Sequence, residues 1–321
     1  PILAEESSSE INFDEYDDST DSSEEEFIRQ QQEKERVHLP RKSSTIWVKK
    51  GEEAELVDDK NIDRNEFDSD DEDLNCSNLR VYETSTKRDA AVTHTAGRRN
   101  YNEDRVCITT NVLGTDLYAV FDGHNGHEAA TYCRDHLKET FESSKGNMVD
   151  TFANLHKSAS EVTKAGCTAT VVAVRTDAIE VANVGDSPAF VIDKQGNIKK
   201  VTHDHKLTDP AEEEMIIKNG GSVINLFGTK RVNGLIMITR SIGDKSLHPP
   251  MTSEPSVTSV PLTDIAYVCL MSDGVTDALS EQRIKEIVMS DRSLVVKTQL
   301  LRNEAYSAGS RDNISAVIIE F

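Results

Sequence analysis

Residues 117–126 read Leu-Tyr-Ala-Val-Phe-Asp-Gly-His-Asn-Gly, and the fold is organised around this stretch. The apolar run 117–121 predicts a buried strand, which stops abruptly at a carboxylate, a glycine and an imidazole. A rigid strand would thus carry Asp122 and His124 to one end of a sheet. Asp-Gly is also a common turn, so a hairpin corner is the alternative reading of this stretch alone.

Other carboxylates recur where further predicted strands begin or end. In chain order they are Glu103 and Asp104 before the strand 105–110, Asp186 after 178–184, Asp273 after 266–272, and Asp312 before 314–321. Two carboxylates about 4 Å apart repel by roughly 4 kcal/mol at an effective dielectric of 20, so their convergence calls for a cation. All-oxygen ligands without paired Cys or His indicate Mg²⁺ or Mn²⁺ rather than zinc or copper, and Ca²⁺ stays open.

The order of the predicted elements indicates the fold class. Most strands follow one another directly, and helices come in pairs, at 128–141 with 148–162 and at 281–289 with 293–305. Such an order does not suit a parallel sheet built of βαβ units. We therefore expect an α+β fold with antiparallel sheets covered by helix pairs. The remaining elements include a short helix that Asp209 caps and a strand at 234–240.

Charge divides the 321 residues into two parts. Residues 1–80 hold 25 Asp and Glu against 10 Lys and Arg, a net charge of −15, which leaves −6 of the total −21 for residues 81–321. We expect residues 1–80 to be an acidic, largely disordered arm and residues 81–321 to be the folded domain. A docking segment is predicted around residues 44–57, near Trp47, and the acidic arm would suit a basic or docking partner.

The composition also excludes several classes of protein. A domain at net −6 has no general field for capturing nucleic acid. The five cysteines are widely spaced and form no Cys-x-x-Cys pair, which argues against a disulfide framework or a zinc site and favours the cytoplasm or nucleus. No apolar run approaches the roughly 18 residues of a membrane span. The chain starts at Pro1 without Met, so a targeting segment lost before Pro1 stays open.

Eight motifs in a fixed order resemble the signature series of the metal-dependent type 2C (PPM family) Ser/Thr protein phosphatases. The resemblance covers about residues 85–321. The motifs are Arg99-Asn100-Tyr101-Asn102-Glu103-Asp104, Val120-Phe121-Asp122-Gly123-His124-Asn125-Gly126, Gly166-Cys167-Thr168-Ala169, Asn183-Val184-Gly185-Asp186-Ser187, Asp204-His205-Lys206, Arg240-Ser241-Ile242-Gly243-Asp244, Ser272-Asp273-Gly274 and Ser310-Arg311-Asp312-Asn313.

The resemblance implies a central antiparallel β-sandwich flanked on both faces by helix pairs, in four layers αββα. It also implies a centre of two Mn²⁺ or Mg²⁺ ions, with a weaker third, that hydrolyses phosphoserine and phosphothreonine in proteins without a phosphoenzyme intermediate. The implied metal residues are Asp122 bridging both ions, Asp273 and Asp312 on one, Glu103 and the Gly123 carbonyl on the other, Asp104 behind them, and Asp186 with Asp273 at the third.

Two further residues receive catalytic roles from the resemblance. Arg99 would grip the substrate phosphate, with Arg98 as the fallback, and His124 would protonate the leaving alkoxide. A surface ion pair is the alternative for Arg99, and a turn cap is the alternative for His124. The motifs 204–206 and 240–244 are expected to be structural.

The sequence departs from the family pattern at a few positions. Pro188 stands where the family usually has Arg after Gly-Asp-Ser, which puts the third-metal region in doubt. Asn125 replaces a usual glycine and Cys167 a usual serine, and no metal ligand is lost. The departures around Pro188 make a pseudophosphatase that acts as a binding module the second hypothesis, and the intact metal ligands argue against it. A metal-dependent nuclease or nucleotide hydrolase is disfavoured by the acidic surface and by the lack of a Gly-x-x-x-x-Gly-Lys loop.

Overall fold

The computed structural model describes residues 45–50, 53–57 and 88–321. The chain divides into two units, residues 1–39 and 40–321, and all the described residues belong to the second. Most of the predicted acidic arm therefore lies outside the described residues. The exceptions are two short strands within the stretch where a docking segment is predicted, β1 at Thr45–Lys50 and β2 at Glu53–Val57.

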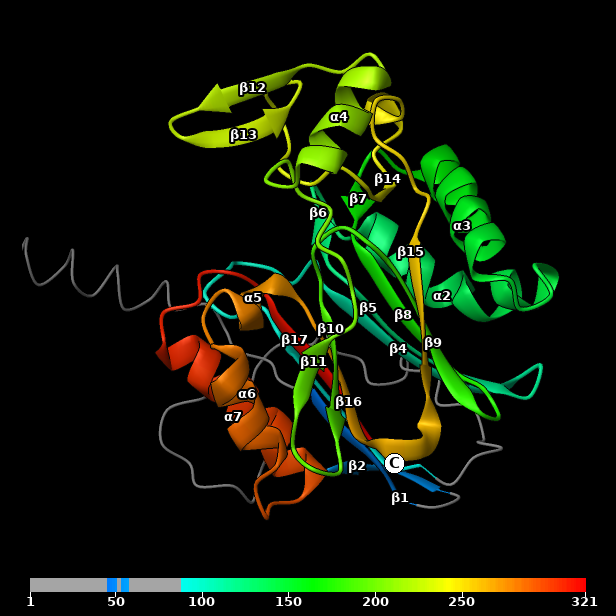
Figure 1. Ribbon diagram of the computed structural model, residues 1–321, viewed down its shortest axis with the longest axis vertical. Coiled ribbons are helices and arrows are strands. Elements are labelled where there is room, and N and C mark those ends of the chain that lie inside the picture. The colour runs from blue at the N-terminus through cyan, green and yellow to red at the C-terminus, as the bar shows by residue number, and fades with distance from the viewer. Residues whose placement is uncertain (1–44, 51–52, 58–87) are drawn as a thin grey trace, which may run out of the picture. The chain divides into compact units, whose positions relative to one another are not determined.

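Two antiparallel sheets stack face to face in this second unit (Figure 1). One sheet has seven strands in the order β11-β10-β16-β17-β3-β1-β2, and the other has five in the order β15-β9-β8-β5-β4. The remaining strands of the first sheet are β3 Ala90–Thr95, β10 Ala189–Asp193, β11 Ile198–Lys200, β16 Ile265–Met271 and β17 Ile314–Glu320. Those of the second are β4 Arg105–Val112, β5 Thr115–Phe121, β8 Ala169–Val174, β9 Ala178–Val184 and β15 Ser256–Pro261.

Strand β5 explains why both faces of its sheet are covered. All seven of its residues are buried. Leu117 and Phe121 pack among residues of the helices, whereas Tyr118 and Val120 pack among residues of the other sheet. Successive side chains of a strand point to opposite faces, so an uninterrupted apolar run needs an apolar layer on each side.

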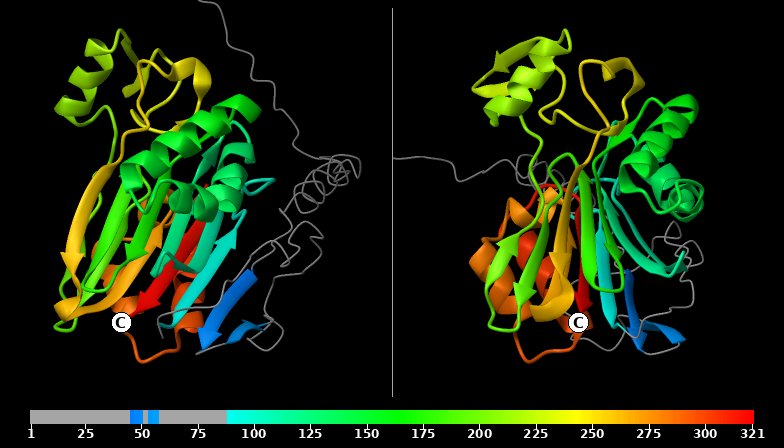
Figure 2. Two further views of the ribbon diagram at one scale, coloured as in Figure 1. Left: turned by 90° about the vertical axis from the view of Figure 1, so that its right-hand side faces the viewer. Right: turned by 45° about the vertical axis from the view of Figure 1, so that its right-hand side comes forward.

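Helix pairs cover the outer faces of the two sheets (Figure 2). Helices α2 (Glu128–Ser143) and α3 (Met148–Val162) lie on the five-stranded sheet, and α6 (Glu281–Val288) and α7 (Leu294–Ser307) lie on the seven-stranded sheet. The predicted four-layer α+β sandwich is confirmed. None of the helices in the described part of the chain has the length and apolar character that crossing a bilayer requires.

A separate substructure lies beyond one end of the sandwich, and we call residues 207–251 the flap (Figure 1). It contains helix α4 (Pro210–Lys218), which Asp209 caps as predicted, and a hairpin of β12 (Val223–Leu226) and β13 (Thr229–Val232). The flap has its own small apolar core, which includes Ile216, Val232 and Ile238.

The strand predicted at 234–240 is wrong. Asn233 and Gly234 have positive φ angles of 51° and 76°, and the residues that follow form only isolated bridges. The alternation that suggested a strand is real, because Ile236 and Ile238 face the flap core while Leu235 and Met237 are exposed. A period of two in burial therefore arose here without a neighbouring strand to pair with.

A third, small sheet connects the flap to the sandwich. Its order is β14-β7-β6, and each strand has only two residues: β6 is Gly123–His124, β7 is Gly166–Cys167 and β14 is Ile242–Gly243. Cys167 pairs with Gly123 on one side and with Ile242 on the other. This sheet places the residues that follow β5 beside the residues that leave the flap.

Candidate active site at the ends of the sheets

The structure brings five of the acidic residues predicted as metal ligands into one electrostatic cluster. Burial raises the pKa of Asp122 well above its usual value, and the charges of Asp104, Asp273, Asp186 and Asp312 raise it further. The first and last of these residues, Asp104 and Asp312, are more than 200 positions apart in the sequence. Each of the five lies at or near the end of a strand or helix. The convergence that the strand ends suggested is therefore present.

Asp273, at the start of the short helix α5 (Asp273–Thr276), shows the same crowding. Burial raises its pKa to about 7, and Asp186 and Asp312 are the next causes. A carboxyl group crowded by other carboxylates is stabilised by a proton or by a metal cation. The donor set consists of oxygen atoms, which suits a hard divalent cation.

Asp104 provides a test of whether the cluster suits a cation. Its side chain is completely buried, and neither carboxylate oxygen makes a hydrogen bond of good geometry, although the Ser315 and Ser272 hydroxyls lie near enough to act to lower its pKa. Burial raises its pKa to about 6. Because an unpaired buried carboxylate is costly, these oxygens call for a positively charged or hydrogen-bonding neighbour. The residues present thus fit a metal centre in their chemistry.

Two other predicted ligands are partly engaged by protein groups. Asp312 Oδ2 accepts a hydrogen bond from Arg99, its Oδ1 accepts one from the Asn313 backbone, and Glu103 Oε1 accepts one from the Gly126 backbone at 2.5 Å. Among residues 88–321, no three His, Cys, Asp or Glu side chains are arranged to hold a metal ion as they stand. Binding a cation would therefore require the acidic side chains to rearrange around it.

Gly123 holds its strand close to the segment that carries Glu103. A Cβ atom at position 123 would lie 2.5 Å from the backbone oxygen of Glu103. Any larger residue would separate the two segments. The glycine therefore keeps its own carbonyl, which was predicted as a metal ligand, beside Glu103.

The two arginines before Glu103 have different surroundings. Arg99 donates to Asp312 Oδ2 at 2.8 Å and to the Arg311 carbonyl at 2.9 Å, so it lies at the edge of the acidic cluster. Arg98 donates to the carbonyls of Ser310 and Tyr306, and its guanidinium covers the Tyr306 ring. Of the two arginines, Arg99 is thus the one that lies beside a predicted metal ligand, Asp312. The contact is an ion pair, which was the alternative to a role in binding phosphate.

Asp186 lies in an ion pair that the sequence analysis did not anticipate. The Lys206 ammonium is 2.8 Å from Asp186 Oδ2, and the Asp186 side chain is 8% exposed. Burial acts to lower the pKa of Lys206, but the charges of Asp186, Asp277 and Asp273 outweigh it and raise the pKa. Pro188, where the family usually has Arg, contributes only its carbonyl, which accepts from the Met271 backbone. The ammonium group of Lys206 thus places a positive charge beside Asp186.

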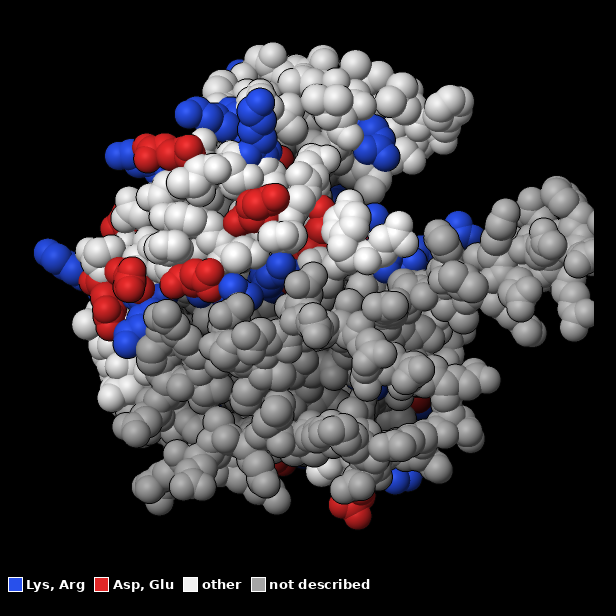
Figure 3. All heavy atoms as spheres, turned by 180° about the vertical axis from the view of Figure 1, so that it is seen from behind, with Lys and Arg blue, Asp and Glu red and all other residues white. Residues whose placement is uncertain are grey.

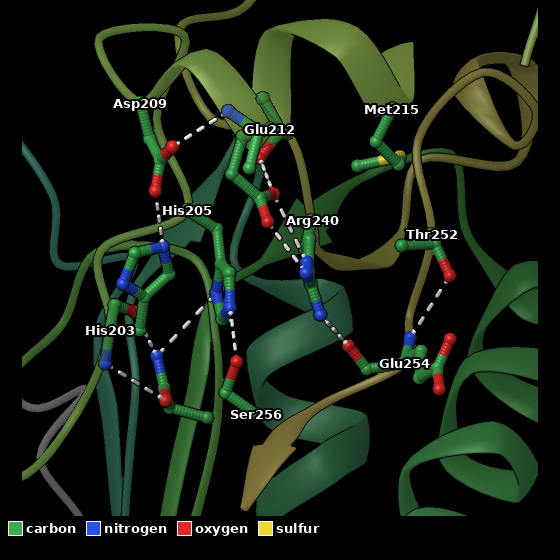
Figure 4. A network of polar contacts seen from close by, with 12 residues as sticks. His203, His205, Asp209, Glu212, Met215, Arg240, Thr252, Glu254 and Ser256 are labelled. Carbon is green, nitrogen blue, oxygen red and sulfur yellow. Dashed lines mark hydrogen bonds and ion pairs between the residues drawn. The ribbon is translucent and has the colours of Figure 1, made fainter. Parts of the chain in front are cut away.

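The signal for Lys206 was its motif, Asp204-His205-Lys206, which was expected to be structural. His205 has that character, because it is fully buried with its pKa lowered by burial to about 4. The Gly185 backbone donates to His205 Nδ1, and Nε2 lies 2.8 Å from Ser256 Oγ (Figure 4). The flap contacts this network where the Thr239 backbone donates to the His205 carbonyl at 2.9 Å, and within the flap the Arg240 guanidinium binds Glu212 of α4 (Figure 4).

His124 points toward the flap side of the cluster. Its Nε2 lies 2.7 Å from Asp244 Oδ2, and its side chain is 23% exposed. Asp244 belongs to the motif 240–244, and the sequence analysis gave it no role. The pairing of His124 with Asp244 depends on β6, β7 and β14. Each of these strands has only two residues, so the sequence shows no alternating pattern from which they could be predicted.

The fold and the site are matched by comparisons with known proteins. The family model of protein phosphatase 2C matches residues 88–314. The chain belongs to this family. The matched residues include every acidic residue of the cluster.

Two curated protein phosphatase 2C relatives show the extent of the similarity. Probable protein phosphatase 2C 71 of Arabidopsis thaliana is 33% identical over 244 residues, covering 70% of this chain and 54% of the relative. Protein phosphatase fem-2 of Caenorhabditis elegans is 30% identical over 253 residues, covering 69% and 56%. This chain thus spans little more than half the length of these relatives.

Solved structures extend the comparison to the protein phosphatase 2C fold. A C. elegans sex determining protein has a TM-score of 0.66 and 28% identity, with 71% of this chain and 64% of that chain covered. Serine-threonine phosphatase 2C from Toxoplasma gondii also has a TM-score of 0.66, at 21% identity, with 73% and 95% covered. The second likeness concerns the fold alone.

Proposed function

We propose that the chain is a Mn²⁺- or Mg²⁺-dependent protein serine/threonine phosphatase. The observation that carries the proposal is the cluster around Asp122, in which four other carboxylates raise the pKa of one aspartate. Membership of the protein phosphatase 2C family supports phosphoproteins as the substrate class. The described part of the face in Figure 3 interleaves Lys and Arg with Asp and Glu, which does not favour nucleic acid as substrate.

The proposed metal ligands follow the positions of the acidic residues. Asp122, Asp273, Asp312, Glu103 and the Gly123 carbonyl would hold the cations. Asp104, which is completely buried, would support them from behind. The bound cations would supply positive charge for the phosphate oxygens and a water of lowered pKa.

The other groups of the site act on the substrate. Arg99 would release Asp312 and bind the substrate phosphate through its planar guanidinium, which matches phosphate geometry. His124 would give a proton to the serine or threonine oxygen as the phosphorus–oxygen bond breaks. Lys206 would hold Asp186, so a third cation at Asp186 and Asp273 would have to compete with an ammonium group.

A pseudophosphatase is the second candidate, and one observation favours it. Asp312 and Glu103 already have protein partners, so a weak metal centre would leave the site closed around Arg99. In that case the domain would bind partners without hydrolysing phosphate esters. The two candidates differ in metal-dependent turnover.

The test measures hydrolysis of p-nitrophenyl phosphate and of a phosphothreonine peptide with Mn²⁺, with Mg²⁺ and with EDTA. We expect turnover only with metal, and a loss of about 100-fold or more in Asp273→Asn, because several kcal/mol of charge stabilisation depend on the cations. Asp291→Asn, an exposed aspartate outside the cluster, is the matched control. Turnover that survives EDTA and Asp273→Asn would refute the proposal, and Mn²⁺ binding without turnover would favour the pseudophosphatase.

A further inference from the structure

Asp244 and His124 form a buried pair at the edge of the candidate site. His124 Nε2 is 2.7 Å from Asp244 Oδ2, and the Asp244 side chain is 3% exposed. An ionised carboxylate can only accept hydrogen bonds, so Nε2 must carry a hydrogen and donate it. The other ring nitrogen, Nδ1, is then the one that remains for the reaction.

The small sheet β14-β7-β6 brings the two residues together across Gly166. Gly166 pairs with His124 on one side and with Gly243 on the other. A Cβ atom at position 166 would lie 2.0 Å from Asp244 Oδ2 and 2.4 Å from His124 Nε2. Only glycine therefore leaves room for this hydrogen bond, and the pair occupies the space that a side chain would fill.

Further contacts fix the orientation of the Asp244 carboxylate. Ser241 Oγ donates to the same Oδ2 atom at 2.7 Å and lies 3.1 Å from His248 Nε2. The Asp244 backbone donates to the Ala165 carbonyl at 3.2 Å. Asp244 also has a positive φ of 47°, a left-handed conformation that few residues other than glycine adopt. A strained backbone, anchored by its own hydrogen bond to Ala165, thus carries a carboxylate whose Oδ2 accepts two hydrogen bonds, one from Ser241 and one from His124.

We propose that Asp244 is a positioning residue that sets which nitrogen of His124 faces the substrate. This inference rests on the proposed phosphatase function. In the reacting form, the His124 ring carries a hydrogen on each nitrogen. Water oxygen bonds to phosphorus, the bond from phosphorus to the serine or threonine oxygen breaks, and the Nδ1 hydrogen passes to that oxygen. One hydrogen of the attacking water stays on the phosphate, and the other passes to solvent, from which Nδ1 is reprotonated. Nε2–H stays hydrogen-bonded to Asp244, which holds the ring in one orientation.

The experiment compares two leaving groups in Asp244→Asn, which keeps the volume of the side chain. A serine or threonine alkoxide needs a proton to leave, whereas p-nitrophenolate is a stable anion that does not. We expect kcat on a phosphothreonine peptide to fall by at least about tenfold with KM unchanged, and kcat on p-nitrophenyl phosphate to fall much less. His124→Ala should show the same selectivity, and the double variant should lose no more than His124→Ala alone.

The matched control is a second His–Asp pair outside the site. His203 Nε2 lies 2.8 Å from Asp209 Oδ2 at the flap (Figure 4), and Asp209→Asn should leave both activities unchanged. A second readout does not depend on turnover. Nitrogen-15 spectra of the histidine side chains should show His124 with its hydrogen on Nε2 in the wild type, and a change of that signal in Asp244→Ala.

The outcomes separate this inference from the proposed function. Equal losses of Asp244→Asn on both substrates, a loss confined to KM, or an unchanged His124 nitrogen signal would overturn the positioning role while leaving the phosphatase intact. A wild-type chain that hydrolyses neither substrate with Mn²⁺ would instead refute the proposed function, and the positioning role with it. Circular dichroism and Tm of each variant would show that it is folded.

Discussion

Arg99 and Asp312 form an ion pair in which the guanidinium Nη2 lies 2.8 Å from carboxylate Oδ2. One partner is the proposed phosphate-binding group and the other a proposed metal ligand. Each therefore restrains the other until substrate and metal are both bound. Since the two side chains are 51% and 39% exposed, the pair is weak enough to exchange partners.

Replacing Arg99 with Ala is expected to raise KM for phosphorylated substrates about 10- to 100-fold, because hydrogen bonds to charged groups contribute about 1.5–3 kcal/mol. The same variant should bind Mn²⁺ more tightly, since Asp312 is released. Initial rates and calorimetric titration with Mn²⁺ measure the two effects. Arg98→Ala is the control, because Arg98 contacts carbonyls and Tyr306, and a KM effect there alone would reassign the phosphate-binding role.

Replacing Lys206 with Met should destabilise the metal-free protein. The change leaves Asp186 buried without its cation, at a cost of about 1–3 kcal/mol and so several degrees of Tm. Mn²⁺ should restore more stability in this variant than in the wild type, because a metal ion can take the place of the ammonium. Thermal unfolding with EDTA and with Mn²⁺ tests this.

Lys200→Met provides the comparison for Lys206. Lys200 is paired with Asp204, but both side chains of this pair are about one third exposed. Its loss should shift Tm little. If both lysine variants lose the same stability and gain equally from Mn²⁺, the proposal that Lys206 stands in for a metal ion at Asp186 is wrong.

Acid should destabilise the domain through His205. Burial lowers the pKa of His205 to about 4, below the 6.5 of an exposed histidine. Between these values the unfolded chain binds the extra proton, so the free energy of unfolding falls as pH falls, by up to about 1.4 kcal/mol per pH unit for this residue. Urea unfolding at pH 7, 6 and 5 should show this slope, and His205→Gln should reduce it.

Two other histidines, the buried His94 and the partly buried His248, also have their pKa lowered to about 4 and should leave part of the slope in place. His127→Gln, at an exposed position, should not alter it. An identical slope in the His205 variant and the wild type would mean that His205 takes up a proton within the folded state.

The tip of the flap hairpin should gain stability from a polar residue. Phe227 has a positive φ of 52° and a fully exposed side chain, followed by Gly228 at 89°. Phe227→Asn should raise the free energy of unfolding by about 0.5–1 kcal/mol, because Asn tolerates the left-handed conformation. Leu226→Asn, on the adjacent strand residue, should give no such gain in urea unfolding, and equal gains would refute the argument from backbone conformation.

The antiparallel sheets with their helix pairs and the place of the acidic cluster could be predicted because they depend on strong local patterns, whereas the sandwich was implied by the resemblance to the type 2C phosphatases. The run at 117–121 is apolar on both faces, which indicates a strand covered on both sides. Asp122, Asp273 and Asp312 adjoin such strands, so their meeting at one end of the sheets followed from the strand ends. Their assignment as metal ligands stays a prediction.

Other features depend on contacts that leave no pattern in the chain. The flap hairpin turns at Leu-Phe-Gly-Thr, which lacks the Asn-Gly or Asp-Gly signal of such turns. The pairing of Lys206 with Asp186 and of Asp244 with His124 requires knowledge of which loops are adjacent. A strand of two residues, such as β7, is too short to show any periodicity.

The position of β1 between β3 and β2 affects how the domain can be shortened. Thr45 pairs with His94 and Val48 with Ala91, so β1 covers the backbone of β3 that would otherwise end the sheet. A chain cut to begin at residue 81, where the composition changes, would lose this cover. The unpaired backbone N–H and C=O groups of β3 would then favour aggregation through pairing with strands of other molecules. A truncation that keeps residues 45–57 is therefore the better choice for a sample that stays monomeric.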